Sequence, residues 1–148
     1  MHMSVRAHSR APWYFTFSAW AFLLWSALAA FDDTMGWLMR DAYFKASGMS
    51  PAQVNYFSTL PLVVKLASTV SIWSGMAGAV ALLTRRRMAS IMFAIAALGT
   101  AVFTGYTWFL SAGIAAMGML WFMPAVIGGV TIVLAVYAVR LAGRGFLR

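Results

Sequence analysis

Long apolar stretches without charged side chains restrict the fold of this chain more than any other feature. Residues 13–31, 88–110 and 119–139 contain no charged side chain, and residues 62–84 contain one, Lys65. A helix needs about 20 residues to cross roughly 30 Å of hydrocarbon. Because a helix satisfies its own backbone hydrogen bonds in lipid, we predict an all-α membrane protein with four transmembrane helices, forming a single domain over residues 1–148.

The composition supports this class and restricts the chemistry. The chain is 63% hydrophobic and 9% charged, with a mean hydropathy of +0.82. It has no Cys, three acids (Asp32, Asp33 and Asp41) and two histidines, His2 and His8, which lie in the N-terminal tail. The spans therefore contain no haem or metal ligands, and we expect no catalytic residue. The sequence identifies no cofactor.

The arginines predict how the helices are oriented. Most of them stand at the ends of apolar runs, as orienting charges do, and they lack the interleaved aromatic residues of a nucleic-acid-binding face. Contacts with anionic lipid headgroups are compatible with the same positions. By contrast, residues 32–60 contain all three acids. We therefore predict that both termini are cytoplasmic and that the chain binds no nucleic acid. The arginines on which this depends are Arg6, Arg10, Arg85, Arg86, Arg87, Arg140, Arg144 and Arg148.

The first apolar stretch has one alternative interpretation. A basic start followed by an apolar run and Ala27-Leu28-Ala29 also resembles a signal peptide with a small-residue cleavage site. The run is longer than the usual apolar region of about 7–15 residues. We therefore expect this stretch to be retained as a span.

Residues 32–60 are expected to lie on the membrane surface. Apolar and polar residues alternate from Met35 to Lys45, which predicts a short interfacial helix ending near Ser47-Gly48. Ser50-Pro51-Ala52-Gln53 combines a capping hydroxyl, a proline and a glutamine at the spacing that begins a second helix. The segment is interpreted either as a spacer between two spans or as a docking surface, with Trp37, Tyr43 and Tyr56 facing a partner.

Lys65 is the charged side chain that enters a predicted span. Its stem can carry the ammonium to the nearby interface. Alternatively, Lys65 pairs with Asp32, which ends the first span at the same depth. An ion pair between them would fasten the first span to the second. Both interpretations remain open at this stage.

Hydroxyl side chains recur on the second and third spans. Spacings of four and three residues place those of the third span on one helical face. They either line a water-filled cavity or join helices by hydrogen bonds, and packing is the more common role of hydroxyls in membrane helices. We predict a polar packing stripe formed by Ser68, Thr69, Thr100, Thr104 and Thr107.

Small residues predict where helices approach one another closely. Ser71, Gly75 and Ala79 form one series with four-residue spacing, and Ala97, Ala101 and Gly105 form another. The fourth span has little polarity, and glycines flatten one of its sides. This helix is predicted to face lipid or a partner through Gly128 and Gly129.

Several short motifs are distributed along most of the chain: Ala30-Phe31-Asp32, Thr34-Met35, Tyr43, Ser50-Pro51-x-Gln53-x-x-Tyr56-Phe57, Pro61, Ile72-Trp73-x-Gly75 and the Arg85–Arg87 turn. Together they resemble a small four-span family of bacterial inner-membrane proteins of unknown function, some of which carry the automatic label "sugar transporter". The resemblance implies a location in the bacterial inner membrane. Asp33, where an aromatic residue is more usual, and Lys65 depart from the family pattern.

Two classes of function are compatible with these features. The first is a non-catalytic accessory subunit that packs in the bilayer against other membrane chains, as in a respiratory or photosynthetic complex. The second is a small solute transporter or conduit that acts as a homo-oligomer. The chain lacks the internal repeats with broken central helices that are typical of transporters, so the accessory subunit is favoured.

Overall fold

Helices form almost all of the chain that the structure describes. The computed structural model describes residues 13–143, 145 and 147, with side chains from residue 16 onward. No strand occurs among these residues, which confirms the all-α prediction. The elements are α1 (Trp13–Leu38), α2 (Asp41–Ala46), α3 (Pro51–Ser58), α4 (Leu62–Leu83), α5 (Met88–Gly105), the π-helix η1 (Tyr106–Leu110), α6 (Gly113–Met117), the 3₁₀ turn η2 (Gly118–Leu120) and α7 (Met123–Gly143).

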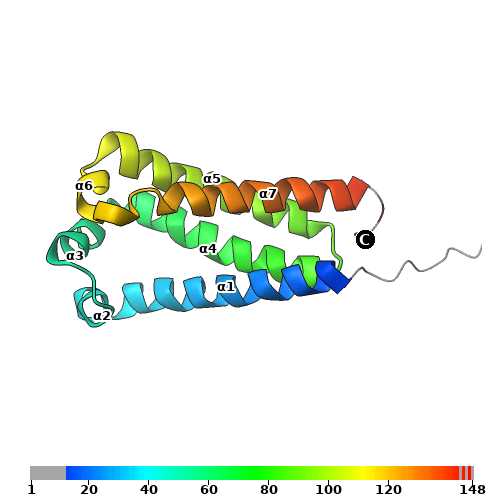
Figure 1. The fold of residues 1–148 in the computed structure, drawn as a ribbon, viewed down its shortest axis with the longest axis horizontal. Helices are drawn as coiled ribbons and strands as arrows, with labels where there is room; N and C mark the ends of the chain where they lie inside the picture. The colour runs from blue at the N-terminus through cyan, green and yellow to red at the C-terminus, as the bar shows by residue number, and fades with distance from the viewer. Residues whose placement is uncertain (1–12, 144, 146, 148) are drawn as a thin grey trace, which may run out of the picture.

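The four long helices run alongside one another, and the short elements gather at one end (Figure 1). Helix α1 packs on α4, α4 on α5, and α5 on α7. We call the end formed by residues 39–61 and 111–122 the cap. The opposite end contains the turn Arg85–Arg87 between α4 and α5 and is called the arginine end.

Three helices are long and apolar enough to cross a membrane. They are Leu62–Leu83, Met88–Leu110 and Met123–Gly143, with mean hydropathies of 1.6, 1.8 and 2.1. The first two of these helices match the predicted spans at 62–84 and 88–110 closely. The last begins four residues later than the predicted 119, because Gly118 has a φ of +57° and residues 118–120 form a separate 3₁₀ turn. Pro124 then lies in the first turn of α7, where proline is tolerated.

Helix α1 is not among these three, so the described part of the chain contains three candidate spans and not the predicted four. It continues to Leu38, seven residues beyond the predicted end at Phe31. Asp32 and Asp33 therefore lie inside the helix and lower its mean hydropathy. The side chains of residues 13–15, at its apolar start, lie outside those that the structure describes.

The cap confirms the two predicted short helices. Helix α2 ends at Ala46 and is followed by Ser47 and by Gly48, whose φ of +78° suits a glycine. At the start of α3, the Ser50 hydroxyl accepts a hydrogen bond from the Gln53 amide, and the Gln53 side chain accepts one from the Ser50 amide. This reciprocal capping is the arrangement that the Ser-Pro-x-Gln spacing predicts.

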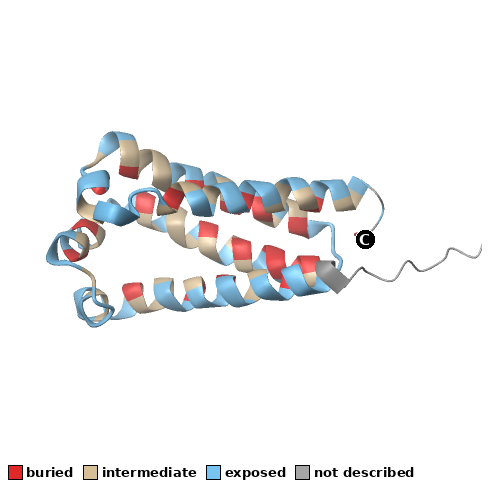
Figure 2. Ribbon diagram, viewed as in Figure 1, coloured by how far each residue is buried: buried red, intermediate tan, exposed pale blue. Residues whose placement is uncertain are grey.

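The apolar core lies toward the arginine end, where all four long helices contribute. Phe93 of α5 is fully buried and packs edge-on against Phe22 of α1, with ring centroids 5.5 Å apart. Ala19, Leu82 and Ala138 complete the contact from α1, α4 and α7. Buried residues follow the inward faces of the helices, whereas most of the outward surface is exposed (Figure 2).

Helices α4 and α5 make the closest crossing. The Ser71 hydroxyl donates to the Ala96 carbonyl at 2.6 Å and lies 2.7 Å from the Thr100 hydroxyl. A Cβ atom added to Gly99 would lie 2.5 Å from the Ala67 carbonyl oxygen and 2.8 Å from Cβ of Ser71. The backbones therefore approach as closely as the absence of a side chain at residue 99 allows.

The predicted small-residue series is correct for α4 and wrong for α5. Ser71, Gly75 and Ala79 are all buried. On α5, Ala101 is exposed and a Cβ on Gly105 would meet no atom within 4 Å. The contacting face of α5 instead contains Phe93, Ala96, Gly99 and Thr100.

We expect Ser71→Ala to lower the free energy of unfolding by about 1 kcal/mol, because it removes interhelical hydrogen bonds. Such bonds contribute roughly 0.6–1.7 kcal/mol to the stability of membrane proteins. Thermal unfolding in detergent measures the loss. Ser74→Ala is the matched control, since the Ser74 hydroxyl bonds within its own helix, to Val70 and Ser71 carbonyls. Equal melting temperatures for the two variants would contradict the interhelical role of Ser71.

Candidate functional site

A polar cluster joins α1 to α4 near the cap. We call it the Asp33 cluster, and it contains Asp33 and Trp37 of α1 with Lys65, Thr69 and Trp73 of α4. The residues contributed by each helix are four positions apart, which places them on one face of that helix. The packing of α1 on α4 brings the two faces together.

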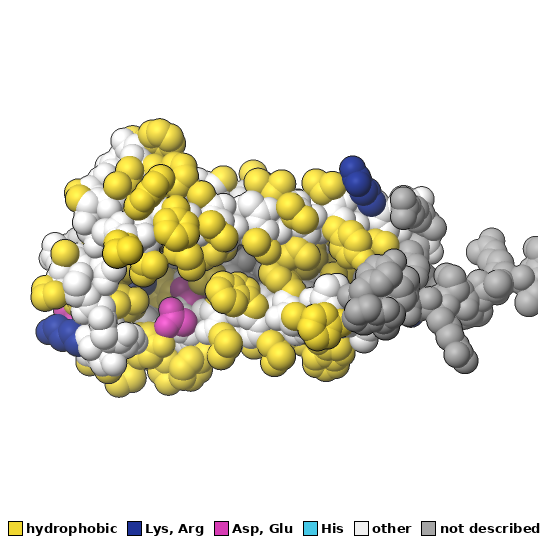
Figure 3. Space-filling view, in the orientation of Figure 1, with side chains coloured by type: hydrophobic (Ala, Val, Ile, Leu, Met, Phe, Trp, Pro, Cys, Tyr) yellow, Lys and Arg dark blue, Asp and Glu magenta, His cyan; other side chains and the backbone are white. Residues whose placement is uncertain are grey.

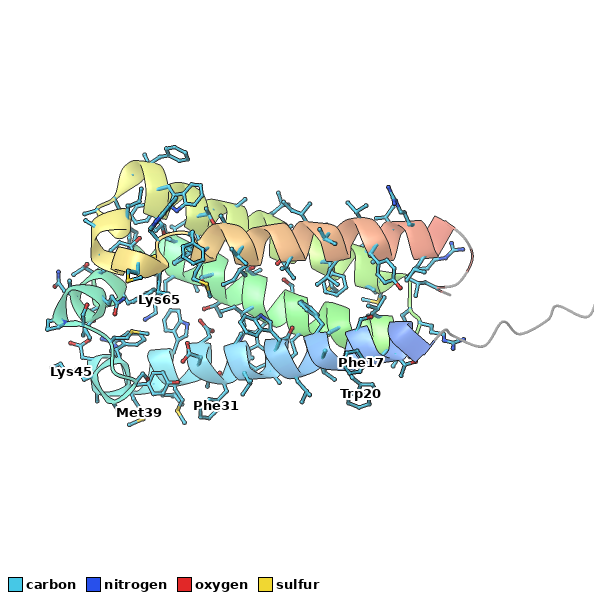
Figure 4. The ribbon with its side chains drawn as sticks, in the orientation of Figure 1. Phe17, Trp20, Phe31, Met39, Lys45 and Lys65 are labelled. Atoms are coloured by element: carbon cyan, nitrogen blue, oxygen red, sulfur yellow. The ribbon has the colours of Figure 1, made fainter. Side chains whose placement is uncertain are left out.

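The contacts of this cluster form a chain between the helices. The Trp37 indole donates to the Thr69 hydroxyl at 2.8 Å, and Thr69 donates to Oδ1 of Asp33 at 3.0 Å. The Lys65 ammonium lies 4.1 Å from the Trp37 ring centroid, within the range of a cation–π interaction. Figure 4 shows Lys65 between the end of α1 and the other long helices.

Asp33 has binding capacity that these contacts do not use. Its Oδ2 atom is buried and has no hydrogen-bond partner among the described residues. The Lys65 charge and the Trp73 indole lie near enough to act on the carboxylate. Buried carboxylate oxygens are normally hydrogen-bonded, so Asp33 is able to accept a further hydrogen bond at this atom.

Asp32 has a different environment from the one proposed from the sequence. The Tyr43 hydroxyl of α2 donates to Oδ1 of Asp32 at 2.6 Å. The described residues show no ion pair between Asp32 and Lys65. The acid that joins α1 to α4 is the next residue, Asp33, through Thr69.

The hydrogen bond to Asp32 raises the pKa of Tyr43 above its ordinary value of 10.0, because it stabilises the protonated phenol; partial desolvation acts in the same direction. The hydrogen bond therefore stabilises the folded protein below pH 10, and this stabilisation is lost as the pH rises through the raised pKa of Tyr43. We expect Asp32→Asn to lower the pKa of Tyr43. Tyrosinate absorbance during alkaline titration measures the shift, with Tyr43→Phe identifying the transition; an unchanged titration in Asp32→Asn would contradict this hydrogen bond.

Tyr56 connects the cap to the long helices from inside. It is 8% exposed, and its hydroxyl donates to Thr107 at 3.1 Å and lies 3.2 Å from the Ser111 hydroxyl. The predicted role of Tyr56 in facing a partner therefore does not agree with its position. Its neighbours in α3 are more exposed, and a single tyrosine at a buried helix position has no distinguishing sequence signal.

The other residues predicted to face a partner occupy mixed positions. Trp37 is directed inward to Thr69 and Lys65, while Tyr43 is half-buried against Asp32. A Cβ on Gly128 would lie 3.4 Å from the Thr100 methyl group, so Gly128 faces α5. Gly129 is exposed, with no atom within 4 Å of its Cβ position.

The predicted polar stripe serves several separate contacts. Thr69 bonds to α1, Thr100 contacts Ser71, and Thr107 accepts from Tyr56 while donating to the Phe103 carbonyl. The buried Thr104 hydroxyl has no hydrogen-bond partner among the described residues. Ser68 is half-buried. Three of the five hydroxyls thus join different elements, which is the packing role expected of them.

Two cavities lie in the cap. One, of about 540 Å³, is an open depression between α3 and α6 that Asn55, Tyr56 and Tyr106 help to line. The other, of about 380 Å³, lies between α2 and α3 beside Asp41 and Lys45. Within the described residues, no group of three or more His, Cys, Asp or Glu side chains could hold a metal ion.

The described residues form a helical protein in which three helices are long and apolar enough to cross a bilayer, and this composition is that of a membrane protein. No protein-family model, curated protein or solved structure matches the chain. The resemblance to a four-span bacterial family therefore stays a prediction.

Proposed function

We propose that this chain is a non-catalytic accessory subunit of a larger assembly in the bacterial inner membrane. It crosses the bilayer four times, with both termini cytoplasmic. The arginine end would face the cytoplasm, because Arg85, Arg86, Arg87 and Arg140 are exposed there, whereas the three acids lie toward the cap.

The surface of α1 supports its role as the fourth crossing. Phe17 is 70% exposed, Leu28 68% and Phe31 56%, on a helix of 26 residues beside α4. In Figure 4, Phe17, Trp20, Phe31 and Met39 project away from the other helices. Such large side chains suit contact with acyl chains and with aromatic belts at the interfaces.

The observation that carries the accessory role is the isolation of α7. Within its span 11% of the residues are buried, compared with 39% for α4, and its extensive contact is with α5 alone. Because lipid provides no hydrophobic force between helices, α7 gains from a second close-packed neighbour. Gly129, which is open on this surface, permits the close approach of another helix.

The polar groups support a non-catalytic role. The hydroxyls of Ser71, Thr100 and Thr107 are used in contacts between elements. In the Asp33 cluster, the Thr69 hydroxyl accepts from Trp37 and donates to Asp33, so it is also used in a contact between helices. The two cavities of the cap are open depressions lined by residues of the cap and of η1.

Site-specific photo-crosslinking in intact membranes tests the proposal. A benzophenone amino acid is placed at Val133 of α7 or at Leu28 of α1, which are 67% and 68% exposed. We expect position 133 to capture one other membrane chain, which also copurifies in fixed stoichiometry in mild detergent, and position 28 to capture lipid. Crosslinking to a second copy of this chain would favour the homo-oligomeric conduit, and no protein product at position 133 would overturn the accessory role.

A further inference from the structure

Two opposite charges with unused binding capacity lie beside each other at the cap end of α1 and α4. The Lys65 ammonium rests on the Trp37 ring, and the described part of the chain places no carboxylate within ion-pair distance of it. Oδ2 of Asp33 has no hydrogen-bond partner there. Charged groups at membrane depth are normally paired, so each of these groups can take a partner of opposite charge.

The surface above these groups is hollowed and open at the side. Helices α1 and α7 share the core at the arginine end, but they have little contact with each other overall. Figure 3 shows acidic side chains in a hollow between α1 and α7, surrounded by hydrophobic side chains. A ligand in this hollow would have charged groups at one end and apolar walls along the rest of its length.

We propose that this hollow binds phosphatidylethanolamine, with the lipid phosphate on Lys65 and its primary ammonium on Asp33. The acyl chains would lie along the apolar surfaces of α1 and α7 toward the middle of the bilayer. Both charges stand near helix ends, at the depth of lipid headgroups, so the lipid can enter sideways. The proposal does not depend on the accessory role or on which side of the membrane the cap faces.

The pair of charges selects this headgroup by its chemistry. A primary ammonium donates hydrogen bonds to a carboxylate, whereas the quaternary ammonium of phosphatidylcholine has no N–H to donate. Phosphatidylglycerol supplies the phosphate without a cation, and its net negative charge meets the carboxylates of Asp32 and Asp33. A headgroup with both charges and N–H donors is therefore complementary to the site.

Asp33 can reach such a ligand without repacking of the helices. The residue is only partly buried, and the terminal torsion of aspartate has a broad energy minimum. Rotation about this torsion can turn the unpaired oxygen without a change in the helix backbone. Trp73, which lies beside the carboxylate, is 45% exposed and has room to shift.

Native mass spectrometry of the purified full chain in detergent tests the proposal. Phosphatidylethanolamine, phosphatidylcholine and phosphatidylglycerol with identical acyl chains are each titrated into the protein. We expect phosphatidylethanolamine to bind about tenfold more tightly than either of the other two, the effect of one charge-assisted hydrogen bond or more. Asp33→Asn should abolish this preference, Lys65→Met should weaken the binding of all three lipids, and Lys65→Arg should retain both the affinity and the preference.

Lys45→Met is the matched control, because Lys45 is an exposed lysine of the same cap and lies outside the hollow. It should leave the preference unchanged. Equal binding of the three lipids to the wild-type chain would overturn the proposal, as would a preference that survives in Asp33→Asn or an unchanged affinity for all three lipids in Lys65→Met. Tighter binding of phosphatidylglycerol would also overturn it, because the site would then be a simple anion site. Should either of these two variants fail to fold, the wild-type and Lys65→Arg comparisons still decide the matter.

Discussion

Gly99→Ala should lower the free energy of unfolding by about 1–3 kcal/mol, the usual cost of forcing an extra group into a packed interior. The added Cβ would lie 2.5 Å from the Ala67 carbonyl oxygen and 3.2 Å from Cα of Ser71. These atoms belong to the backbone of α4, so they cannot yield by rotation of a side chain. The two helices would have to separate, which would also strain the hydrogen bonds of Ser71.

Gly105→Ala on the same helix is the control for this prediction. A Cβ there meets no atom within 4 Å, so only the intrinsic preference of a helix for alanine over glycine changes. Denaturant titration of both variants in mixed micelles measures the difference. A Gly99→Ala protein as stable as Gly105→Ala would show that α4 and α5 do not cross as closely as the structure has them.

Gly113→Ala should release the cap from the long helices. Its Cβ would lie 2.5 Å from the Thr107 methyl group, 2.7 Å from the Thr107 carbonyl oxygen and 2.8 Å from the Tyr56 hydroxyl. We expect loss of the hydrogen bond between Tyr56 and Thr107 and a destabilisation of about 1–3 kcal/mol. Hydrogen exchange of α3 and α6 should increase more than that of α4 and α5.

Gly129→Ala is the corresponding control, because its Cβ position has no neighbour within 4 Å. Its exchange rates should match those of the wild-type chain in both regions. If Gly113→Ala accelerates exchange equally throughout the chain, the cap is not a separate unit held by Tyr56. Unchanged exchange in α3 would contradict the close contact at residue 113.

Local signals predicted the elements that are determined locally. The spans at 62–84 and 88–110 follow from long apolar runs, and α3 follows from the spacing of Ser50, Pro51 and Gln53. The sequence predicts the ends of α1 and α7 less well. The apolar run of the first span ends before Asp32 and Asp33, but a helix tolerates these aspartates once they can reach polar partners such as Tyr43 and Thr69.

Contacts between helices were harder to predict, because they depend on which face of each helix is turned inward. The sequence placed Lys65 near Asp32 in depth but could not choose between neighbouring acids that differ by about 100° around the helix. The spacing Asp33-Trp37 and Lys65-Thr69-Trp73 was available as a signal for the Asp33 cluster. Likewise, Ala97, Ala101 and Gly105 on α5 fit the small-residue rule, but Gly99, which makes the close contact with α4, does not belong to that series.

The order in which the long helices pack has a consequence for biogenesis. Each of α4, α5 and α7 packs against the long helix that immediately precedes it in the chain. During synthesis, every helix that leaves the insertion machinery can therefore dock at once on one that is already in the bilayer, without waiting for a later segment. A nascent chain that stops after α5 should already hold the tightest of its helix crossings.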